Sequence, residues 1–258
     1  MAKIISFSNQ KGGVGKTSTC VNVCAALALK GKRVLLIDID PQGNATTGLG
    51  FTKNNLKNSV YNLLIDEINP AETIYQTQIE NLDLIPASID LAGAEVELVY
   101  VKNREKRLKE RVEDLLPLYD YIMIDCPPSL GLLTINALTA SNSVIIPIQS
   151  EYYALEGLSQ LMNTIKLVAK HLNPNLIIDG VVVTMYDGRA LISKQILAEI
   201  NKFFGKKMFE TIIPRNIRVS EAPSHGVPVM LHDPRCTGAK AYIALADEFL
   251  ARENKGKK

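Results

Sequence analysis

The 258-residue sequence contains no tryptophan and only four cysteines: Cys20, Cys24, Cys126 and Cys236. The cysteines form no C-x-x-C pair, so we expect free thiols rather than a disulfide framework. No apolar run approaches the roughly 18 residues that a membrane-spanning helix needs, and the chain does not begin with a basic segment followed by an apolar one, as a signal peptide does. We therefore expect a protein of the cytoplasm.

Metal-binding and catalytic patterns built on cysteine or histidine are also missing. Cys20 and Cys24 stand four residues apart on an expected helix, a spacing that can clip a metal ion, but no histidine or further cysteine follows at ligand spacing. Packing in the core is therefore the favoured interpretation for both. His171, His225 and His232 fit no catalytic spacing and are interpreted as structural or surface groups.

The composition is that of an ordinary globular protein. The chain has 29 basic and 27 acidic residues, and 47% of its residues are hydrophobic, which excludes a disordered tail-like protein and a collagen-like fibre. Without an internal repeat, a low-complexity segment or a linker, the sequence predicts one domain over residues 1–258, with an ordered core from about 3 to 250 and a short polar, basic tail at 251–258.

Charge is distributed unevenly along the chain. Up to Ser159 there are 14 basic and 18 acidic residues, a net charge of −4, whereas the remainder has 15 basic and 9 acidic residues, a net charge of +6. A basic carboxyl-terminal part can attract a polyanion.

Short apolar runs alternate with longer helical patterns along the chain. This order is typical of repeated β-α units, so the sequence predicts an α/β fold with a mainly parallel, twisted sheet flanked by helices. The expected strands are Ile4–Ser8, Val34–Ile39, Leu82–Pro86, Tyr121–Asp125, Val144–Ile148, Leu176–Thr184 and Met208–Ile213. The expected helices are Lys16–Leu29, Ile89–Leu115, Leu132–Ala140, Leu155–His171, Leu191–Phe204 and Ala239–Glu248. The expected loops are Asp40–Asn58, Pro127–Gly131 and Pro223–Pro234.

A glycine-rich segment, NQKGGVGKT, follows the first expected strand and opens the first expected helix. Backbone N–H groups can cradle phosphate oxygens only where side chains do not crowd them, which explains Gly12, Gly13 and Gly15. The amino terminus of the helix adds its positive dipole end at the same point. We expect the Lys16 ammonium on the β- and γ-phosphate oxygens and the Thr17 hydroxyl on Mg²⁺. The sequence therefore predicts a phosphate-binding loop, as in a P-loop NTPase.

The loop departs from the strict pattern G-x-x-x-x-G-K-[ST], because Gln10 stands where that pattern has its first glycine. It carries instead a second lysine, Lys11, five residues before Lys16. One cation beside the phosphates serves an ordinary phosphate loop, so Lys11 requires its own explanation.

Carboxylates stand at the carboxyl ends of two of the expected strands. Asp38 and Asp40 come at the end of one, and Asp125 ends another. Ligands of an open parallel sheet bind at the carboxyl ends of its strands. A carboxylate placed there can ligate phosphate-bound Mg²⁺, usually through water, or orient an attacking water molecule. For Asp38 a catalytic role and a role as hydrogen-bonded anchor of the following loop both stay open.

With these residues the chain resembles the ParA/Soj family of partitioning ATPases. KGGVGKT is similar to the deviant Walker A loop of that family. Further blocks resemble the family in its order, namely LLIDIDPQGNAT, YIMIDCPPSLG, EYYALEG, VTMYDGR and IPRNIRVSEAPSHG, so that the resemblance covers roughly Lys3 to Leu250.

The resemblance implies an ATP-dependent homodimer that hydrolyses ATP to ADP and phosphate with Mg²⁺. Lys11 would cross the dimer interface to the triphosphate of the partner, as an arginine finger supplied in trans does. Lys11, Lys16, Asp40 and Asp125 would be catalytic. Thr17 and Asp125 would hold the metal, Asp125 through water. The base would lie at Pro214 and Asn216, with Met185 a weaker candidate. The implied nucleotide-binding residues are Lys11, Gly12, Gly13, Val14, Gly15, Lys16, Thr17, Ser18, Pro214 and Asn216.

The resemblance also implies nonspecific binding of double-stranded DNA by the dimer, and hence association with the nucleoid. Arg189 in MYDGR and Arg218 in IPRNIR are the implied contacts, with Lys194 and Lys206 as further candidates. The sequence has no recognition-helix or zinc-finger pattern, so contact with phosphates is expected. A centromere-binding partner of the ParB/Spo0J type would stimulate hydrolysis.

Three other functions are weighed against this one. A MinD-like, membrane-associated cell-division ATPase shares the loop but needs an amphipathic carboxyl-terminal helix, whereas no bulky apolar face follows Leu250. A reductase with an iron–sulfur cluster across a similar dimer needs two cysteine ligands from each subunit, and Cys126 has no matching second cysteine. A scaffold that binds ATP without hydrolysis is disfavoured by the presence of Lys16, Thr17, Asp40 and Asp125.

Overall fold

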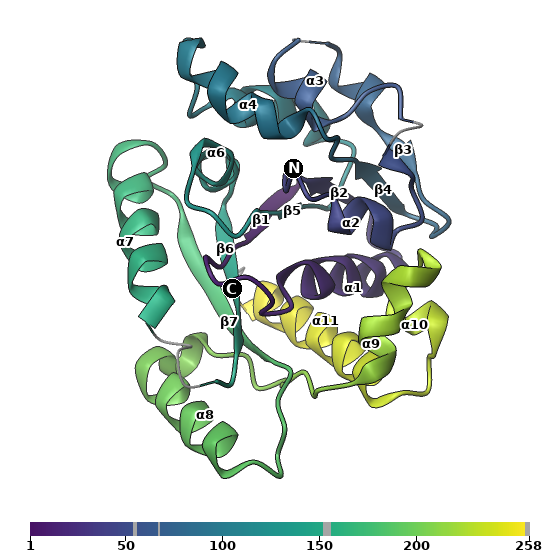
Figure 1. The fold of residues 1–258 in the computed structure, drawn as a ribbon, viewed down its shortest axis with the longest axis vertical. Coiled ribbons are helices and arrows are strands. Elements are labelled where there is room, and N and C mark those ends of the chain that lie inside the picture. The colour runs from purple at the N-terminus through teal and green to yellow at the C-terminus, as the bar shows by residue number, and fades with distance from the viewer. Residues whose placement is uncertain (54–55, 67, 152–155, 256–258) are drawn as a thin grey trace.

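A seven-stranded sheet forms the centre of the protein, in a computed structural model that describes residues 1–258 except 54–55, 67, 152–155 and 256–258 (Figure 1). The strand order is β3-β4-β2-β5-β1-β6-β7, and every neighbouring pair is parallel except β3 and β4. The predicted fold class is therefore confirmed. The strands are β1 (Lys3–Phe7), β2 (Val34–Asp38), β3 (Tyr75–Gln76), β4 (Leu82–Ile85), β5 (Tyr121–Asp125), β6 (Ser143–Gln149) and β7 (Ile177–Thr184).

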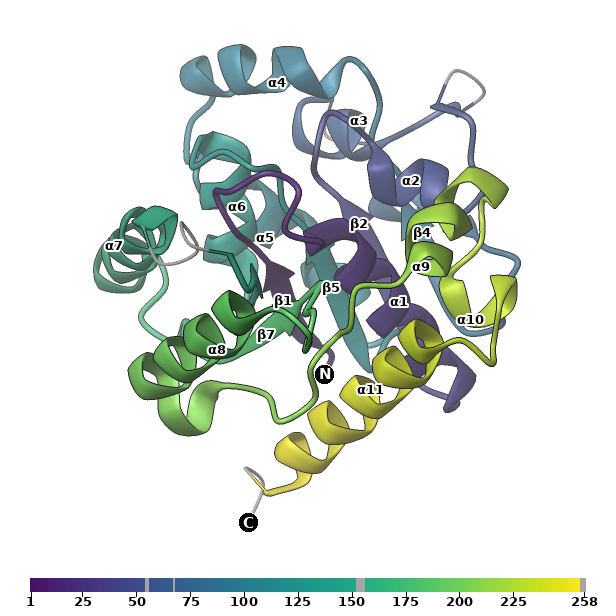
Figure 2. The same ribbon diagram turned by 60° about the horizontal axis from the view of Figure 1, so that its bottom comes forward.

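Helices cover both faces of this sheet (Figures 1 and 2). Helices α1 and α11 pack side by side on one face, with α10 beside them. Helices α3 to α8 contribute to the cores on the opposite face. The helices are α1 (Lys16–Leu29), α2 (Asn44–Gly48), α3 (Val60–Leu64), α4 (Leu91–Glu97), α5 (Arg107–Val112), α6 (Leu132–Ala140), α7 (Glu156–His171), α8 (Leu191–Phe204), α9 (Ile217–Glu221), α10 (Val229–His232) and α11 (Thr237–Lys255).

The central strands are apolar on both sides because each side meets helices. Along β5, Tyr121 and Met123 belong to the core beneath α1 and α11, whereas Ile122 and Ile124 belong to the opposite core. Side chains alternate between the faces of a strand, so a strand buried on both faces shows a continuous apolar run. This is the pattern from which the strands were predicted.

The predicted strand at Met208–Ile213 is wrong. The segment forms no regular strand beside β7. It has one isolated bridge, between Met208 and Val181, and the N–H groups of Phe209 and Ile213 donate to the Val181 and Val183 carbonyls at 2.8 and 2.9 Å. Between them the backbone N–H groups of Glu210 and Thr211 donate to the Glu248 carboxylate of α11, each at 2.8 Å. The Glu248 carboxylate thus takes the Thr211 N–H, which in a regular ladder would donate to β7 between those of Phe209 and Ile213.

The predicted helix over Ile89–Leu115 is also interrupted. Helix α4 ends at Glu97, a short 3₁₀ helix follows at Leu98–Tyr100, and α5 begins only at Arg107. Between them Val101 is extended and Asn103 adopts a left-handed backbone with φ of 55°, which a continuous helix cannot contain. Strand β3 was not predicted, because two residues at a sheet edge carry no periodicity.

The carboxyl-terminal part continues the last helix. Helix α11 runs to Lys255, so the segment from 251 that was predicted as a polar tail is helical as far as the structure describes it. Arg252 stacks on the Phe209 ring, with 4.0 Å between the guanidinium carbon and the ring centroid, and donates to the Met208 carbonyl at 2.6 Å. None of the helices in the described part of the chain has both the length and the apolar character needed to cross a membrane.

Gly180 in β7 allows a close approach that a larger residue would prevent. A Cβ atom there would lie 2.8 Å from Cδ2 of the buried Phe209 ring and 3.0 Å from the Lys207 carbonyl oxygen. We expect Gly180→Ala to lower the free energy of unfolding by about 1–3 kcal/mol through overpacking, as measured by urea denaturation. Gly93→Ala in α4, where the added atom meets only the end of the Glu97 side chain at 3.3 Å, is the control and should not destabilise. Equal stability of both variants would contradict the close packing.

Candidate functional site

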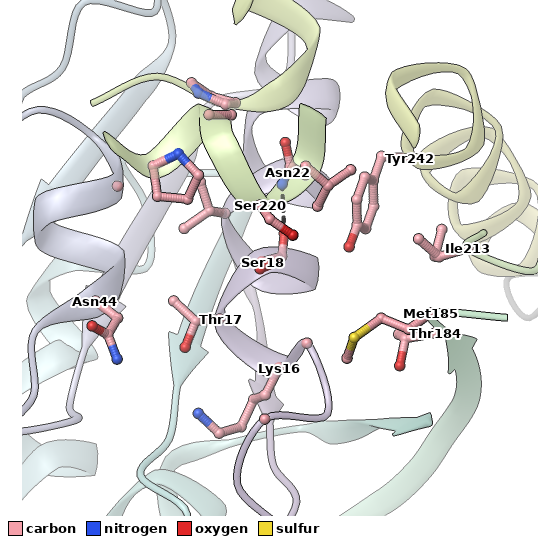
Figure 3. A pocket seen from close by; sticks show the side chains of 18 of the residues that line it. Lys16, Thr17, Ser18, Asn22, Asn44, Thr184, Met185, Ile213, Ser220 and Tyr242 are labelled. Atoms are coloured by element: carbon pink, nitrogen blue, oxygen red, sulfur yellow. Dashed lines mark hydrogen bonds between the residues drawn. The ribbon is translucent and has the colours of Figure 1, made fainter. Parts of the chain in front are cut away.

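A cavity of about 640 Å³ opens where the phosphate loop, the end of β7 and the segment around α9 meet (Figure 3). Its floor lies at the carboxyl ends of three adjacent strands, because Asp125 pairs in register with Phe7 of β1 and with Asp38 of β2. The cavity therefore lies where an open parallel sheet binds its ligands. Of the predicted nucleotide-binding residues all but Val14 line it.

The phosphate loop is tied to the sheet on both sides. Asn9 accepts a hydrogen bond from the Lys11 N–H at 3.0 Å and donates to the Pro147 carbonyl of β6 at 2.7 Å. At the other end the Thr184 hydroxyl of β7 donates to the Val14 carbonyl at 2.7 Å. The Val14 side chain is buried and does not line the cavity. Gly15, with φ of 75°, makes the left-handed turn into α1.

Lys16 is the charged centre of the site. Its side chain is only 7% exposed, and its Nζ lies 3.4 Å from an Asp125 oxygen and 3.9 Å from an Asp40 oxygen. Burial disfavours the ammonium form, but Asp125 and Asp40 outweigh it and raise the pKa of Lys16 above its ordinary value. A fixed ammonium group beside a glycine-rich loop is suited to phosphate oxygens.

Thr17 and Asp125 form the oxygen pair predicted to hold a metal ion. The Thr17 hydroxyl donates to Asp125 at 2.7 Å. Burial raises the pKa of Asp125, and Lys16 and Thr17 oppose that shift. Among the described residues no group of three or more His, Cys, Asp or Glu side chains could hold a metal by itself. The pair fits Mg²⁺ that is shared with phosphate, since this ion takes few protein ligands and keeps phosphate oxygens and waters.

The aspartates after β2 face different surroundings. Asp40 lines the cavity, and one of its oxygens accepts from the Gln42 N–H at 2.9 Å. Asp38 has no exposed surface and is not among the lining residues. Burial, and after it the charge of Asp125, raises the pKa of Asp38 to about 7. Of the roles left open for Asp38, its contacts are those of an anchor.

Lys11 differs from Lys16 in both exposure and partner. Its ammonium lies 3.1 Å from Glu151, which follows β6, and the two side chains are 32% and 52% exposed. Gln149 also donates to Glu151. Of the EYYALEG block that Glu151 begins, residues 152–155 lie outside the described residues.

The predicted base pocket forms the other end of the cavity. Pro214, Asn216 and Met185 all line it, and Met185 has a left-handed backbone with φ of 50°, a strained state that is common at functional sites. Both polar ends of the Asn216 side chain are already engaged. Its oxygen caps α9 by accepting from the Arg218 N–H at 2.9 Å, and its nitrogen donates to Thr237 of α11 at 2.8 Å.

Several lining residues were not predicted from the sequence. Asn22 donates to the Ser18 carbonyl at 2.7 Å and accepts from the Val229 N–H at 2.8 Å, which joins α1 to α10 beside the cavity (Figure 3). Ser220 and Tyr242 reach the same wall from α9 and α11. The one signal for Asn22 was its polarity among the apolar residues that follow Thr19 in α1. Ser220 and Tyr242 meet the site only through tertiary folding.

The two arginines predicted to contact DNA are exposed and already paired within the chain. Arg189 is 92% exposed and forms a two-pronged contact with Asp187, at 3.0 and 2.9 Å, which lowers the pKa of Asp187 to about 2. Arg218 is 51% exposed and donates to Glu221 at 2.8 Å. A second, open cavity contains Arg189 but not Arg218, and Arg215, which was not predicted, lines both cavities.

The cysteines and histidines lie where packing dictates. Cys20, Cys24 and Cys126 are buried free thiols, and burial raises the pKa of the Cys126 thiol to about 12. His225 and His232 stack on one another with ring centroids 4.7 Å apart.

Comparison with known proteins gives a family match over part of the chain and relatives that cover nearly all of it. A family model described as an AAA domain matches residues 2–178. The sporulation initiation inhibitor protein Soj of Bacillus subtilis is 60% identical over 97% of this chain and 99% of its own length. The chromosome partitioning protein ParA of Myxococcus xanthus is 51% identical over 98% and 89%. The chromosome-partitioning ATPase Soj of Treponema pallidum is 49% identical over 98% and 99%.

Solved structures share the fold. The crystal structure described as cobyrinic acid a,c-diamide synthase from Mycobacterium smegmatis, with bound ADP and magnesium, has a TM-score of 0.88 and 38% identity over 99% of this chain and 97% of that one. The cell division ATPase MinD of Pyrococcus furiosus has a TM-score of 0.80 and 26% identity over 97% and 99%.

The Asn216 cap allows a direct test of how the base end of the site is held. Asn216→Ala removes the acceptor for the Arg218 N–H and the donor to Thr237, so we expect the free energy of unfolding to fall by about 1 kcal/mol, the usual effect of losing a helix cap. Asn216→Asp keeps the acceptor and should lose less. Urea denaturation of both variants checks this prediction. Equal losses of unfolding free energy in the two variants would show that the missing cap is not the cause of the destabilisation.

Proposed function

The chain belongs to the Soj/ParA family of chromosome-partitioning ATPases, and on this premise we propose that it is a Mg²⁺-dependent ATPase whose dimerisation and DNA binding are governed by ATP. The observation that carries the proposal is the buried Lys16 ammonium, held between Asp125 and Asp40 at the mouth of a glycine-rich phosphate loop. A solved neighbour at 38% identity contains ADP and magnesium. ATP and Mg²⁺ are the ligands that this combination of groups favours.

The triphosphate would lie along the loop with its β- and γ-phosphate oxygens on Lys16. Mg²⁺ supplies neutralisation of phosphate charge when it is bound with ATP. Thr17 is suited to hold it, because the hydroxyl proton is directed to Asp125 and the oxygen lone pairs stay available. Asp125 thereby orients the ligand, as outer-shell carboxylates do. The base would pack against Pro214 and Met185, with Asn216 holding the wall in place.

Hydrolysis requires a water molecule in line with the γ-phosphate. Asp40 is the cavity-lining carboxylate on the Lys16 side, and its other oxygen is fixed by the Gln42 N–H. A carboxylate so placed can accept a proton or a hydrogen bond from the attacking water. We assign to Asp40 the orientation of that water.

Dimerisation would depend on Lys11. In the proposed dimer its ammonium leaves Glu151 and contacts the triphosphate of the partner, so that ATP is enclosed between two subunits. Hydrolysis would then release the contact and separate the subunits. The protein would act as a timed switch in chromosome or plasmid partitioning.

The dimer would bind nucleoid DNA without sequence preference. Arg189 and Arg218 would contact phosphates, with Lys194 and Lys206 as further contacts, and the net charge of +6 after Ser159 supports this. A centromere-binding protein of the ParB/Spo0J type would stimulate hydrolysis and release the DNA, so we place the protein in the cytoplasm at the nucleoid.

The MinD-like alternative is less well supported. The MinD structure is 26% identical to the chain, whereas the partitioning proteins reach 49–60%. The end of α11 is also occupied, because Arg252 packs against Phe209 and bonds to Met208. The amide-forming activity in the name of the Mycobacterium smegmatis protein is disfavoured because that protein is 38% identical to the chain, whereas the Bacillus subtilis Soj protein is 60% identical.

Lys11 gives the sharpest test of the switch. We expect the molar mass of the wild-type protein in solution to double with ATP and Mg²⁺, and not with ADP or without nucleotide. Lys11→Ala should bind ATP but stay monomeric and hydrolyse it on the order of 10³-fold more slowly, the loss expected for a cation supplied in trans. Lys16→Ala should lose ATP binding in calorimetry.

Lys30→Ala is the matched control, because Lys30 also forms a surface ion pair, with Asp247 at 2.7 Å, but does not line the cavity. It should behave as the wild type. The proposed switch would be contradicted if the molar mass of the wild type did not change with nucleotide, or if Lys11→Ala dimerised normally. Capture of the ATP form by lipid vesicles instead of DNA would favour the MinD-like alternative.

A double Arg189→Ala, Arg218→Ala variant tests the DNA surface. With two phosphate contacts removed from each protomer, we expect the ATP dimer to form normally but to bind DNA at least about tenfold more weakly, with a reduced dependence of affinity on salt. Arg33→Ala is the control, since Arg33 is an exposed, ion-paired arginine at the amino end of β2. Unchanged DNA affinity of the double variant would rule out this surface.

A further inference from the structure

A buried carboxylate beneath the site makes contacts that its place in the sequence does not reveal. Asp38 accepts hydrogen bonds from the Asp40 N–H at 3.2 Å, the Thr46 N–H at 2.8 Å and the Thr46 hydroxyl at 2.7 Å. It has no exposed surface, and a buried carboxylate is tolerated only where such donors compensate it. Asp38 is therefore committed to holding its neighbours and has no contact with the cavity.

The contacts continue through Thr46 to a third segment. While the Thr46 hydroxyl donates to Asp38, it accepts from the Ala87 N–H at 3.0 Å, just beyond β4. Thr46 is fully buried and belongs to α2, which lies beside the carboxyl ends of β2 and β4 (Figure 1). A single buried chain of hydrogen bonds thus joins the end of β2, α2 and the start of the segment after β4.

The loop that carries Asp40 is held at both of its ends by these buried hydrogen bonds. Asp38 holds the backbone N–H of Asp40 on one side and Thr46 on the other. Between them the Gly43 N–H closes the turn on the Asp40 carbonyl at 2.8 Å, and the Gln42 N–H fixes an Asp40 carboxylate oxygen at 2.9 Å. The direction of the Asp40 carboxylate therefore depends on where Asp38 and Thr46 hold the loop.

We propose that Asp38, acting through Thr46, is a positioning residue for ATP hydrolysis that sets the direction of the Asp40 carboxylate. The proposal rests on the proposed function, in which Asp40 orients the attacking water. Neither Asp38 nor Thr46 lines the cavity. Their loss should therefore affect the hydrolytic step and leave the binding of ATP and the formation of the dimer intact, because Lys11, Lys16 and the glycine loop belong to other segments.

Variants of Thr46 separate this role from simple packing. Thr46→Val keeps the shape and the backbone N–H but removes the hydroxyl that joins Asp38 to Ala87. We expect kcat at saturating ATP to fall at least about tenfold, with KM for ATP changed by less than about threefold, since misplacing a group by about 1 Å can reduce a rate by about 10²-fold. Thr46→Ser restores the hydroxyl and should recover kcat to within about threefold of the wild type.

The matched control is Thr73→Val. Thr73 is also fully buried and its hydroxyl also makes a hydrogen bond, to the Pro70 carbonyl at 2.7 Å, but it lies outside the cavity in a 3₁₀ helix at Pro70–Thr73. Loss of a buried hydroxyl there should leave kcat unchanged. Urea denaturation of every variant confirms that the protein measured is folded.

Asp38→Asn completes the test. Asparagine has one acceptor oxygen where the carboxylate has two, so it cannot accept from both the Asp40 N–H and Thr46. We expect kcat to fall as in Thr46→Val, and the double variant should be little worse than either single variant because both break one chain. Any of three results would overturn the proposal. The losses of the two single variants could multiply in the double variant, the variants could change KM alone while kcat stays the same, or folded Thr46→Val could keep the wild-type kcat.

Asp40→Ala distinguishes this failure from a failure of the proposed function. If Asp40→Ala dimerises with ATP without hydrolysing it while Thr46→Val and Asp38→Asn keep the wild-type kcat, only the positioning role is wrong. If Asp40→Ala hydrolyses ATP as the wild type does, the assigned role of Asp40 and the positioning role that depends on it both fall.

Discussion

The site depends on one buried charge, the Lys16 ammonium. An ammonium group at 7% exposure is stable only with carboxylates beside it, because an unpaired buried ion loses several kcal/mol of hydration. Asp125 at the end of β5 and Asp40 after β2 supply them. They can do so only because β5 lies between β1 and β2 in the sheet, so that the helix following β1 begins directly above both carboxylates. The strand order is thus a requirement of the site.

The charges beneath the cavity are not balanced by this lysine alone. Asp38, Asp40 and Asp125 come together at the ends of two adjacent strands, and burial raises the pKa of both Asp38 and Asp125. A carboxylate whose pKa is raised has too little positive charge or too few donors near it to compensate fully for its burial. Such a floor is better suited to a phosphate that arrives with a divalent cation than to a bare anion, which agrees with the proposed use of Mg²⁺ and ATP.

The sequence predicted what local pattern and motif determine, and missed what distant segments decide. The apolar runs located the parallel strands, and the order of strand, glycine loop and helix located Lys16 and Thr17 at the cavity. The segment Met208–Ile213 has a strand-like composition, but the Glu248 carboxylate from α11 takes its donors. The contacts of Asp38 with Thr46 escaped prediction in the same way, because spacing alone could not tell a ligand from an anchor. No local pattern indicated that the Asn216 side chain makes hydrogen bonds within the protein, to the Arg218 N–H and the Thr237 hydroxyl.

The two lysines of the phosphate loop differ in burial and in how strongly their ion pairs hold them. Lys16 is enclosed and shared between two buried carboxylates, so its ammonium is held from two sides. Lys11 pairs with Glu151 at the surface, where both side chains are substantially exposed, and an exposed pair contributes only about 0–1 kcal/mol. Its backbone, however, is fixed through Asn9 to β6, so the ammonium can change partner without movement of the loop. A cation that is anchored at its base and loosely paired at its tip can be transferred to a second subunit at little cost in free energy, and Lys11 meets both conditions while Lys16 meets only the first.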